Sequence, residues 1–385
     1  MVSVSYTSDL FAEGASPYGV PLTFLLSQLD LSAIISDIEK TYYAPCLTHY
    51  FHYRPELMLK LWFFKQYHKL TFRNVIASLT DDDLFYLLTA KEWEEYKRHE
   101  FRLPSPSALH YFMHNRLGEE GLTRIMFQLG KEILHYLNHH PELAKSQNAI
   151  IDSTPLEASR YSLYNAYNPY YGILMSKAHI ISVEGYPLYC IFSEGTEDDG
   201  TYGHRLVHAI KSMNPQFATC LCDGGYDNFL MYAEIHEELK AVPVIRIRDN
   251  YTIHFEATRK EIWKLINSLW KEGGDVHDSH QKKLTFLYNL QLEDMKNPDK
   301  YKELVGMNLR NKNITYYKEI EEQLKRRGRC EQFHSQMKDV FMFNVKGCQK
   351  YSRANYVMLD FITAQAMMLA YLQNGSLNKS LAGFV

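Results

Sequence analysis

The chain has 385 residues, of which 46% are hydrophobic and 23% charged, and its formal net charge is −3. This length allows two or three domains with a large core, while the near-neutral charge gives no overall attraction to a polyanion. Six cysteines scattered through a chain without a signal peptide predict reduced thiols and a cytoplasmic location. No apolar run approaches the roughly 18 residues of a membrane span, so we expect no membrane partner.

Zinc is not expected from the spacing of the cysteines and histidines. Cys220 and Cys222 lie one residue apart in an extended run, which places both on one strand face instead of in a tetrahedral knuckle. His204, His208 and the pair His139-His140 show no pattern with nearby acids that indicates metal binding.

Residues 1–147 are predicted to form an all-helical N-terminal domain of five or six helices. Apolar residues recur at helical spacing, Pro55 and Thr80 are typical of helix starts, and Pro104-Ser105-Pro106-Ser107 is a helix breaker. The predicted helices begin near Leu22, Pro55, Leu70, Thr80, Ala108 and Gly121.

From Asn148 the pattern changes to short apolar and alternating runs, which predict strands. Two of these runs flank Glu184-Gly185-Tyr186, a hairpin signal. The predicted order is three strands, helix, strand, helix, strand, which is that of a ribonuclease-H-like α/β core with a mixed sheet flanked by helices. We assign residues 148–249 to the first part of this catalytic domain, 250–325 to a mainly helical insertion and 326–385 to its last part.

Three carboxylates stand out in this region. Asp152 and Asp223 each follow an apolar run, Ala149–Ile151 and Ala218–Cys222, and we expect both at strand ends; Glu331 follows a basic cluster on a helix. If they meet, they offer the hard oxygen ligands that two Mg²⁺ ions prefer, and Mn²⁺ could substitute. The alternative is two turn-forming aspartates, since Asp-Gly-Gly is itself a turn signal. Asp227 lies close to Asp223, and we expect it to cap the next helix.

A basic segment accompanies these acids. Residues 300–353 hold 13 Lys/Arg against 6 Asp/Glu. Such an excess of positive charge is expected where a protein must guide the phosphate backbone of DNA towards bound metal ions. Lys338 lies two helical turns beyond Glu331, and the fork of Arg327 can bind a phosphate through two hydrogen bonds. The alternative is a solvated helix face with surface charge pairs.

The chain resembles DDE transposases of bacterial insertion sequences, in the group that spans families four and five. Three motifs carry the resemblance: Ile150-Ile151-Asp152-Ser153-Thr154, Cys222-Asp223-Gly224-Gly225-Tyr226-Asp227 and Arg327-x3-Glu331-x6-Lys338. In this family a tyrosine precedes the arginine by three residues, and here that position is Leu324. Tyr317, two turns earlier, could face the same side.

The resemblance implies a transposase that binds the terminal inverted repeats of a transposon and target DNA, both double-stranded, as a homodimer. It implies Asp152, Asp223 and Glu331 as catalytic metal ligands for Mg-dependent strand cleavage and strand transfer in a bacterial, nucleoid-associated protein. The expected DNA-binding residues are Arg327, Lys338, Lys325, Arg326 and Arg329.

Further DNA contacts are predicted from isolated residues. Residues 1–150 are slightly acidic, so contacts there must be local, and the candidates are Arg73, Arg98, Arg102 and Arg116. Trp263 and Trp270 are seven residues apart and are expected to pack inward from one helix face; the alternative is a wedge against a flipped base.

Two other functions remain open from the sequence. A transposase-derived protein that only binds DNA is consistent with the acidic net charge and with Leu324 in place of tyrosine. A ribonuclease-H-like nuclease in repair or defence would cut DNA without preferring particular ends.

Overall fold

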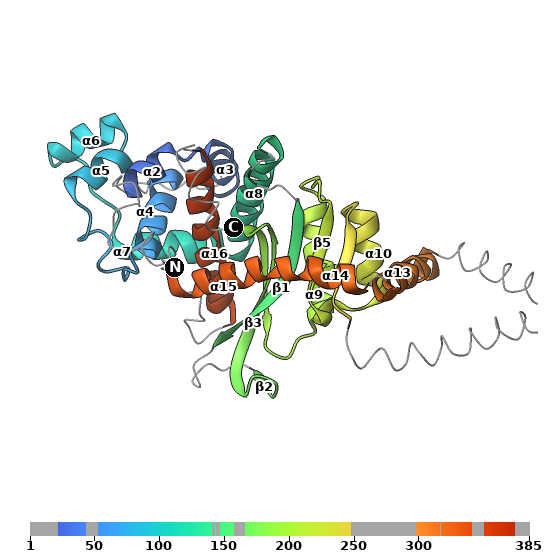
Figure 1. Cartoon of the computed structure of the whole chain (residues 1–385). Coiled ribbons are helices and arrows are strands. Elements are labelled where there is room, and N and C mark those ends of the chain that lie inside the picture. Colours follow the sequence, from blue (N-terminus) through green and yellow to red (C-terminus); the bar gives the residue numbers. More distant parts are fainter. Residues whose placement is uncertain are drawn as a thin grey trace, which may run out of the picture. The chain divides into compact units, whose positions relative to one another are not determined.

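The computed structural model describes residues 22–43, 53–140, 143, 147–157, 166–247, 298–315, 317–340 and 350–373. The chain forms two compact units (Figure 1). The first unit comprises Met1–Glu197 and Gly328–Val385, and the second comprises Asp198–Arg327. The division predicted from the sequence, into residues 1–147, 148–249, 250–325 and 326–385, stays a prediction.

The N-terminal part of the first unit is helical, as predicted. Its helices are α2 (Leu22–Gln28), α3 (Ser32–Ile38), the π-helix η1 (Glu39–Tyr43), α4 (Pro55–Tyr67), α5 (Asp81–Leu87), α6 (Ala90–Lys97), α7 (Pro106–Tyr111), the π-helix η2 (Phe112–Leu117) and α8 (Gly118–His139). The start signals act locally, because Thr80 and Thr89 each form a capping box at the head of α5 and α6. Pro55 and Pro106 occupy first-turn positions that need no N–H donor.

The helix predicted to open at Leu70 is wrong. Residues 72–78 form turns, which are held by isolated backbone hydrogen bonds such as Val75 N–H to Thr71 O and Ser78 N–H to Asn74 O. A short segment rich in β-branched and turn-forming residues gains too little from one or two such bonds to sustain a regular helix.

Four antiparallel strands follow in the first unit: β1 (Asn148–Glu157), β2 (Ala166–Asn168), β3 (Ile173–Val183) and β4 (Tyr186–Glu194). β3 pairs with each of the other three. The predicted hairpin joins β3 to β4, and both of its turn residues have positive φ, 51° at Glu184 and 94° at Gly185. This is the backbone twist that favours a tight hairpin turn.

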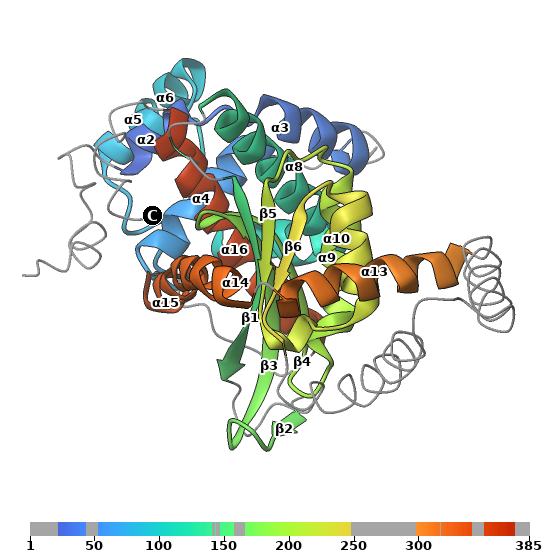
Figure 2. The same cartoon turned by 45° about the vertical axis from the view of Figure 1, so that its right-hand side comes forward.

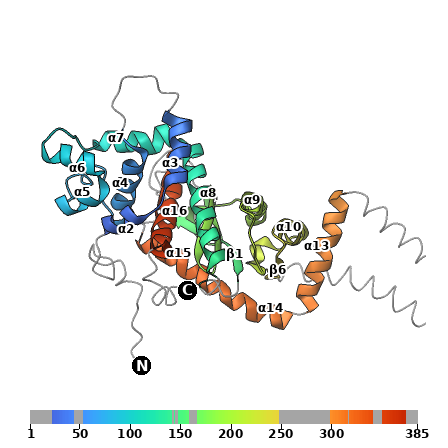
Figure 3. The same cartoon turned by 90° about the horizontal axis from the view of Figure 1, so that it is seen from above.

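Two helices that lie far apart in the sequence cover β4. α8 and α16 (Lys350–Gln373) both contact this strand, and α16 also contacts α2 and α4 (Figure 3). The buried Gln365 amide of α16 donates to Leu188 O of β4 at 2.9 Å and to Met126 O of α8 at 3.2 Å. One side chain therefore ties three elements of the core together.

The second unit is built around a parallel strand pair (Figure 2). β5 (Thr219–Cys222) and β6 (Val242–Ile245) are joined through α10 (Phe229–Glu238), and α9 (Asp199–Lys211) packs against α10. The remaining elements are the 3₁₀ turn η3 (Gly224–Tyr226), α13 (Pro298–Thr315), α14 (Tyr317–Leu324) and the 3₁₀ turn η4 (Lys325–Arg327).

The fold is the predicted mixed α/β, ribonuclease-H-like class preceded by a helical region. The long strands and helices follow the expected order, β1, β3, β4, α9, β5, α10, β6, with β2 as a short addition. In the insertion, α13 and α14 are helical as expected, whereas Trp263 and Trp270 lie outside the described residues. Within the described residues, no helix is both long and apolar enough to cross a lipid bilayer.

Candidate functional site

Asp152 lies in the middle of β1, so its predicted place at a strand end is wrong. The strand continues through Glu157 because the residues after Asp152 pair with His179–Met175 of β3. Asp152 is only 7% exposed, and its Oδ1 accepts a hydrogen bond from Ser153 N–H at 3.0 Å. The carboxylate is therefore held by a rigid, paired backbone.

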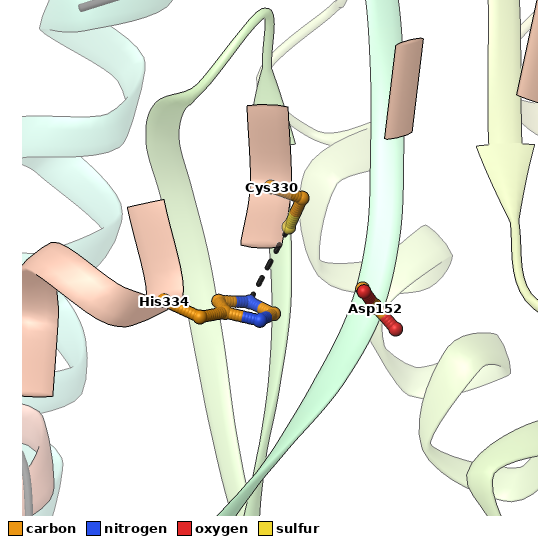
Figure 4. A group of neighbouring side chains, drawn as sticks. All are labelled: Asp152, Cys330 and His334. Atoms are coloured by element: carbon orange, nitrogen blue, oxygen red, sulfur yellow. Dashed lines mark hydrogen bonds between the residues drawn. The ribbon is translucent and has the colours of Figure 1, made fainter. Parts of the chain in front are cut away.

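Helix α15 (Gly328–Val340) brings a thiol and an imidazole to this carboxylate (Figure 4). Cys330 and His334 are buried, and one ligand atom from each lies within 4.8 Å of the others and of an Asp152 oxygen. The Cys330 Sγ and His334 Nε2 atoms are 3.3 Å apart. These two residues are four apart in sequence, so they occupy one face of the helix.

Glu331 and Lys338 lie on the same helix, and both are exposed. Glu331 is not a member of the buried group around Asp152. Sequence reasoning did not single out Cys330 or His334 as site residues. The available signal was the Cys-x3-His spacing on a helix whose Phe333 and Met337 are buried.

Asp223 in the second unit directly follows the last residue of β5, as predicted. Its Oδ1 lies 2.7 Å from Nη1 of Arg327. Burial raises the pKa of Asp223, but the Arg327 charge, the Gly224 N–H and Arg246 outweigh burial and leave that pKa below its usual value. Asp223 is therefore ionised at neutral pH, with Arg327 as its counter-charge.

Asp227 does not cap α10, so that prediction is wrong. Asn228 has the extended backbone of an N-cap, and its Oδ1 accepts from Met231 N–H at 2.9 Å. Asp227 instead forms a bidentate pair with Arg310 of α13, at 2.7 and 2.8 Å, and both residues are buried. The Asp223–Asp227 motif thus contains one half-exposed acid and one structural acid.

The basic cluster lies at the end of α14 and the start of α15. Lys325 and Arg326 are exposed, and Lys325 pairs with Glu322. Arg327 is in η4, one residue before α15 begins, and the side chain of Arg329 lies outside the described residues. Leu324, where the family has tyrosine, is the last residue of α14 and is half-buried.

The carboxylates of Glu234, Asp198 and Asp199 have structural partners. Glu234 accepts from His204 at 2.7 Å and pairs with His208 at 3.4 Å. Asp198 caps α9 by accepting from Thr201 N–H. The Asp199 carboxylate lies close to Gly225, where an added Cβ would be 2.8 Å from Asp199 Oδ2.

A family model described as a transposase DDE domain matches residues 144–359, more than half of the chain. The chain belongs to the DDE transposases. Comparisons with curated proteins and with solved structures gave no match. The family acts on DNA with divalent metal ions, and all of β1, β5 and α15 lie inside the matched residues.

The residues present in this DDE transposase fit divalent cations of two kinds. Asp152, Asp223 and Glu331 offer carboxylate oxygens, the ligands that Mg²⁺ and Mn²⁺ prefer. Cys330 and His334 beside Asp152 offer sulfur and nitrogen, which Mg²⁺ does not favour but Zn²⁺ does. Asp152 is common to both sets.

Proposed function

We propose that this DDE transposase binds the ends of its transposon and carries out metal-dependent strand cleavage and strand transfer, with Asp152, Asp223 and Glu331 as its catalytic acids. The observation that carries the proposal is the match to the transposase DDE domain, whose residues 144–359 include all three carboxylates. The resemblance further implies a homodimer acting on a pair of inverted repeats.

The three acids would hold two Mg²⁺ ions, for which Mn²⁺ can substitute. When bound, such ions help to ionise the attacking oxygen and stabilise the charge on the leaving oxygen. The local structure supports these roles for two of the acids. Asp152 is fixed by the β1–β3 pairing, and the lowered pKa of Asp223 keeps its carboxylate charged at neutral pH.

Arg327 links DNA binding to the state of Asp223 in this proposal. Its guanidinium pairs with Asp223, and a DNA phosphate is an equally suitable bidentate partner. Transfer of Arg327 from carboxylate to phosphate would free Asp223 oxygens for cations as DNA arrives. Lys338, Lys325, Arg326 and Arg329 would add phosphate contacts along the same segment.

Two phosphoryl transfers then follow. In cleavage, a water oxygen bonds to phosphorus and the bond to the 3′ oxygen breaks, which leaves a 3′-hydroxyl and a 5′-phosphate. In strand transfer, that 3′-hydroxyl oxygen bonds to a phosphorus of target DNA, and the target's own bond to its 3′ oxygen breaks. The exposed positions of Glu331 and Lys338 on α15 are open to a duplex.

The proposal is tested by cleavage of DNA that carries the flanking ends of the encoding locus, with Mg²⁺, Mn²⁺ or a chelator. Asp152→Asn, Asp223→Asn and Glu331→Gln are each expected to lose cleavage by about 10³-fold or more while keeping their folded circular dichroism spectra. Glu319→Gln, which removes an exposed acid of α14, is the control and should cut normally.

The same experiment separates the other two functions. Retained DNA binding with no cut under any metal would overturn the proposal in favour of a DNA-binding descendant. Cuts that ignore the ends would indicate a nuclease with another role.

A further inference from the structure

The first unit buries a carboxylate, a thiol and an imidazole together. Asp152, His334 and Cys330 are 7%, 6% and 0% exposed, and their ligand atoms lie within 4.8 Å of one another (Figure 4). We propose that this group is a binding site for a soft divalent transition metal ion of the Zn²⁺ class, and that such an ion competes with the catalytic ions for Asp152.

The chemistry of the three donors selects the ion. Thiolate sulfur, imidazole nitrogen and carboxylate oxygen are the zinc ligands of proteins, whereas Mg²⁺ takes oxygen almost alone. Tetrahedral zinc with usual bond lengths places a sulfur and a nitrogen ligand about 3.6 Å apart. The Cys330 Sγ and His334 Nε2 atoms are already 3.3 Å apart. The separation of these two ligand atoms is thus already close to that around a bound ion.

The elements that carry the ligands make the group rigid. Asp152 is in the paired strand β1, while Cys330 and His334 lie one turn apart on α15, which contacts β1. Ser182 of β3 donates a hydrogen bond to Cys330 Sγ at 3.9 Å, so a neighbour outside the group orients the sulfur. Three protein ligands leave one position of a tetrahedral ion for water or another group.

The competition for Asp152 rests on the proposed function, whereas binding of the soft ion does not. If Asp152 is a catalytic ligand, an ion held by Asp152, Cys330 and His334 removes it from the carboxylate set. Zn²⁺ would therefore inhibit Mg²⁺-dependent cleavage by occupying a defined site instead of by precipitating DNA or protein.

The binding site is tested with Co²⁺, a spectroscopic substitute for Zn²⁺, added to the reduced full-length protein after metal removal. We expect a thiolate-to-cobalt charge-transfer band that saturates at one ion per chain and disappears when Zn²⁺ is added. Cys330→Ala should abolish the band, and His334→Gln should weaken binding by about 10–100-fold or more. Cys190→Ala removes another buried thiol of the first unit and should leave the band unchanged.

Several results would overturn the site. A band that persists in Cys330→Ala would belong to other thiols, such as Cys220 and Cys222, whose sulfur atoms are 4.0 Å apart. Absence of any band in the wild type would show that the group is only a hydrogen-bonded part of the core.

A second variant controls for folding. Cys330→Ser keeps the side-chain volume, so loss of the band in this variant with a native circular dichroism spectrum excludes misfolding as the cause.

Competition is measured as the ratio of cleavage rates with and without Zn²⁺ at fixed Mg²⁺, within each variant. The wild-type ratio should fall about tenfold or more, and the Cys330→Ala ratio should stay near one. Equal ratios would overturn the competition. If no variant cuts DNA at all, the proposed function fails, while the cobalt spectrum still decides whether the site exists.

Discussion

The charge of Asp223 depends on Arg327. The two side chains are 40% and 16% exposed, so the pair is neither fully solvated nor sealed from water. Such a position allows the carboxylate to be both ionised and reached by a cation. A fully buried pair would be hard to separate, and a fully exposed one would have little effect on either group.

Replacing Arg327 with methionine should raise the pKa of Asp223, because burial then acts without its main opposing charge. In the wild type, the folded-state pKa of Asp223 lies below the usual value of 3.8. Ionised Asp223 therefore contributes stability above pH 3.8, and this contribution is lost as pH falls through the folded-state pKa. Carboxyl NMR titration measures the pKa shift, and acid unfolding should show that Asp223 contributes less stability in Arg327→Met than in the wild type. Arg326→Met is the control, and an identical Asp223 titration in both variants would refute the link.

The Arg310–Asp227 pair has a different role from the Asp223–Arg327 pair. Its side chains are 3% and 0% exposed, and removal of one partner leaves an uncompensated charge in the core. We expect Arg310→Met to lower the free energy of unfolding by about 3–5 kcal/mol. Lys325→Met breaks the exposed pair with Glu322 and should leave the free energy of unfolding nearly unchanged, because water screens this pair. Urea unfolding measures both, and similar values for the two variants would contradict this assignment.

At the scale of elements, the helix that covers β4 approaches it unusually closely at one glycine. A Cβ on Gly130 of α8 would lie 2.1 Å from the Leu188 carbonyl oxygen, the same oxygen that accepts from Gln365. Real side chains do not tolerate such a distance, so α8 has to move if any other residue is placed there. The helix, the strand and α16 are thus positioned by one small residue and one amide.

Gly130→Ala is therefore expected to destabilise the protein by about 1–3 kcal/mol through overpacking. Gly328, at the start of α15, has nothing within 4 Å of an added Cβ, and Gly328→Ala should be neutral or slightly stabilising. Thermal and urea unfolding of the two variants give the comparison. An equal effect at both positions would show that helix propensity, not the contact with Leu188, determines the outcome.

Much of the order of helices and strands could be predicted from the sequence, because the spacing of apolar residues, the helix caps and the turn residues all act on nearby backbone. Thr80, Pro106 and the Glu184-Gly185 turn are examples. The errors are of a different kind. Asp152 continues a strand because β3 pairs with the residues beyond it, and Asp227 meets Arg310, 83 positions away. Neither partner leaves a signal near the residue itself.

The candidate site shows the same limit. The position of Asp223 after β5 followed from an apolar run that ends in an acid. The group of Asp152 with Cys330 and His334 could not be predicted in this way, because it forms only where α15 contacts β1. Spacing on α15 can show that a cysteine and a histidine share a face, but not that a carboxylate from a strand meets them.

At the scale of the whole molecule, charge is concentrated instead of abundant. The net charge is −3, while residues 300–353 hold 13 basic against 6 acidic residues. In the proposed function, this concentration of positive charge would help to orient the duplex before specific contacts form. Lys325 and Arg326, which directly precede Arg327 in this segment, are both exposed.

Replacing Lys325 and Arg326 together with alanine should weaken DNA binding and make it less sensitive to salt. Each lost phosphate contact lowers the slope of log affinity against log salt by about 0.9, so two contacts account for about 1.8. Fluorescence anisotropy across a salt series measures this slope. The control replaces the exposed Lys211 and Lys240 of the second unit, and an equal loss of slope in both double variants would argue against a local contact.

The Glu184 turn has a consequence for Asp152. Glu184 is buried, its N–H donates to Asn148 O, and its carboxylate accepts from Asn148 N–H, which fixes the first residue of β1. Side chains alternate along a strand, so a slip of one position would turn Asp152 to the opposite face and put Ser153 in its place. The contacts between Glu184 and Asn148 thus help to fix the register that determines which face of β1 carries Asp152. Loss of the two Glu184 contacts with Asn148 should therefore loosen the β1–β3 register that positions Asp152.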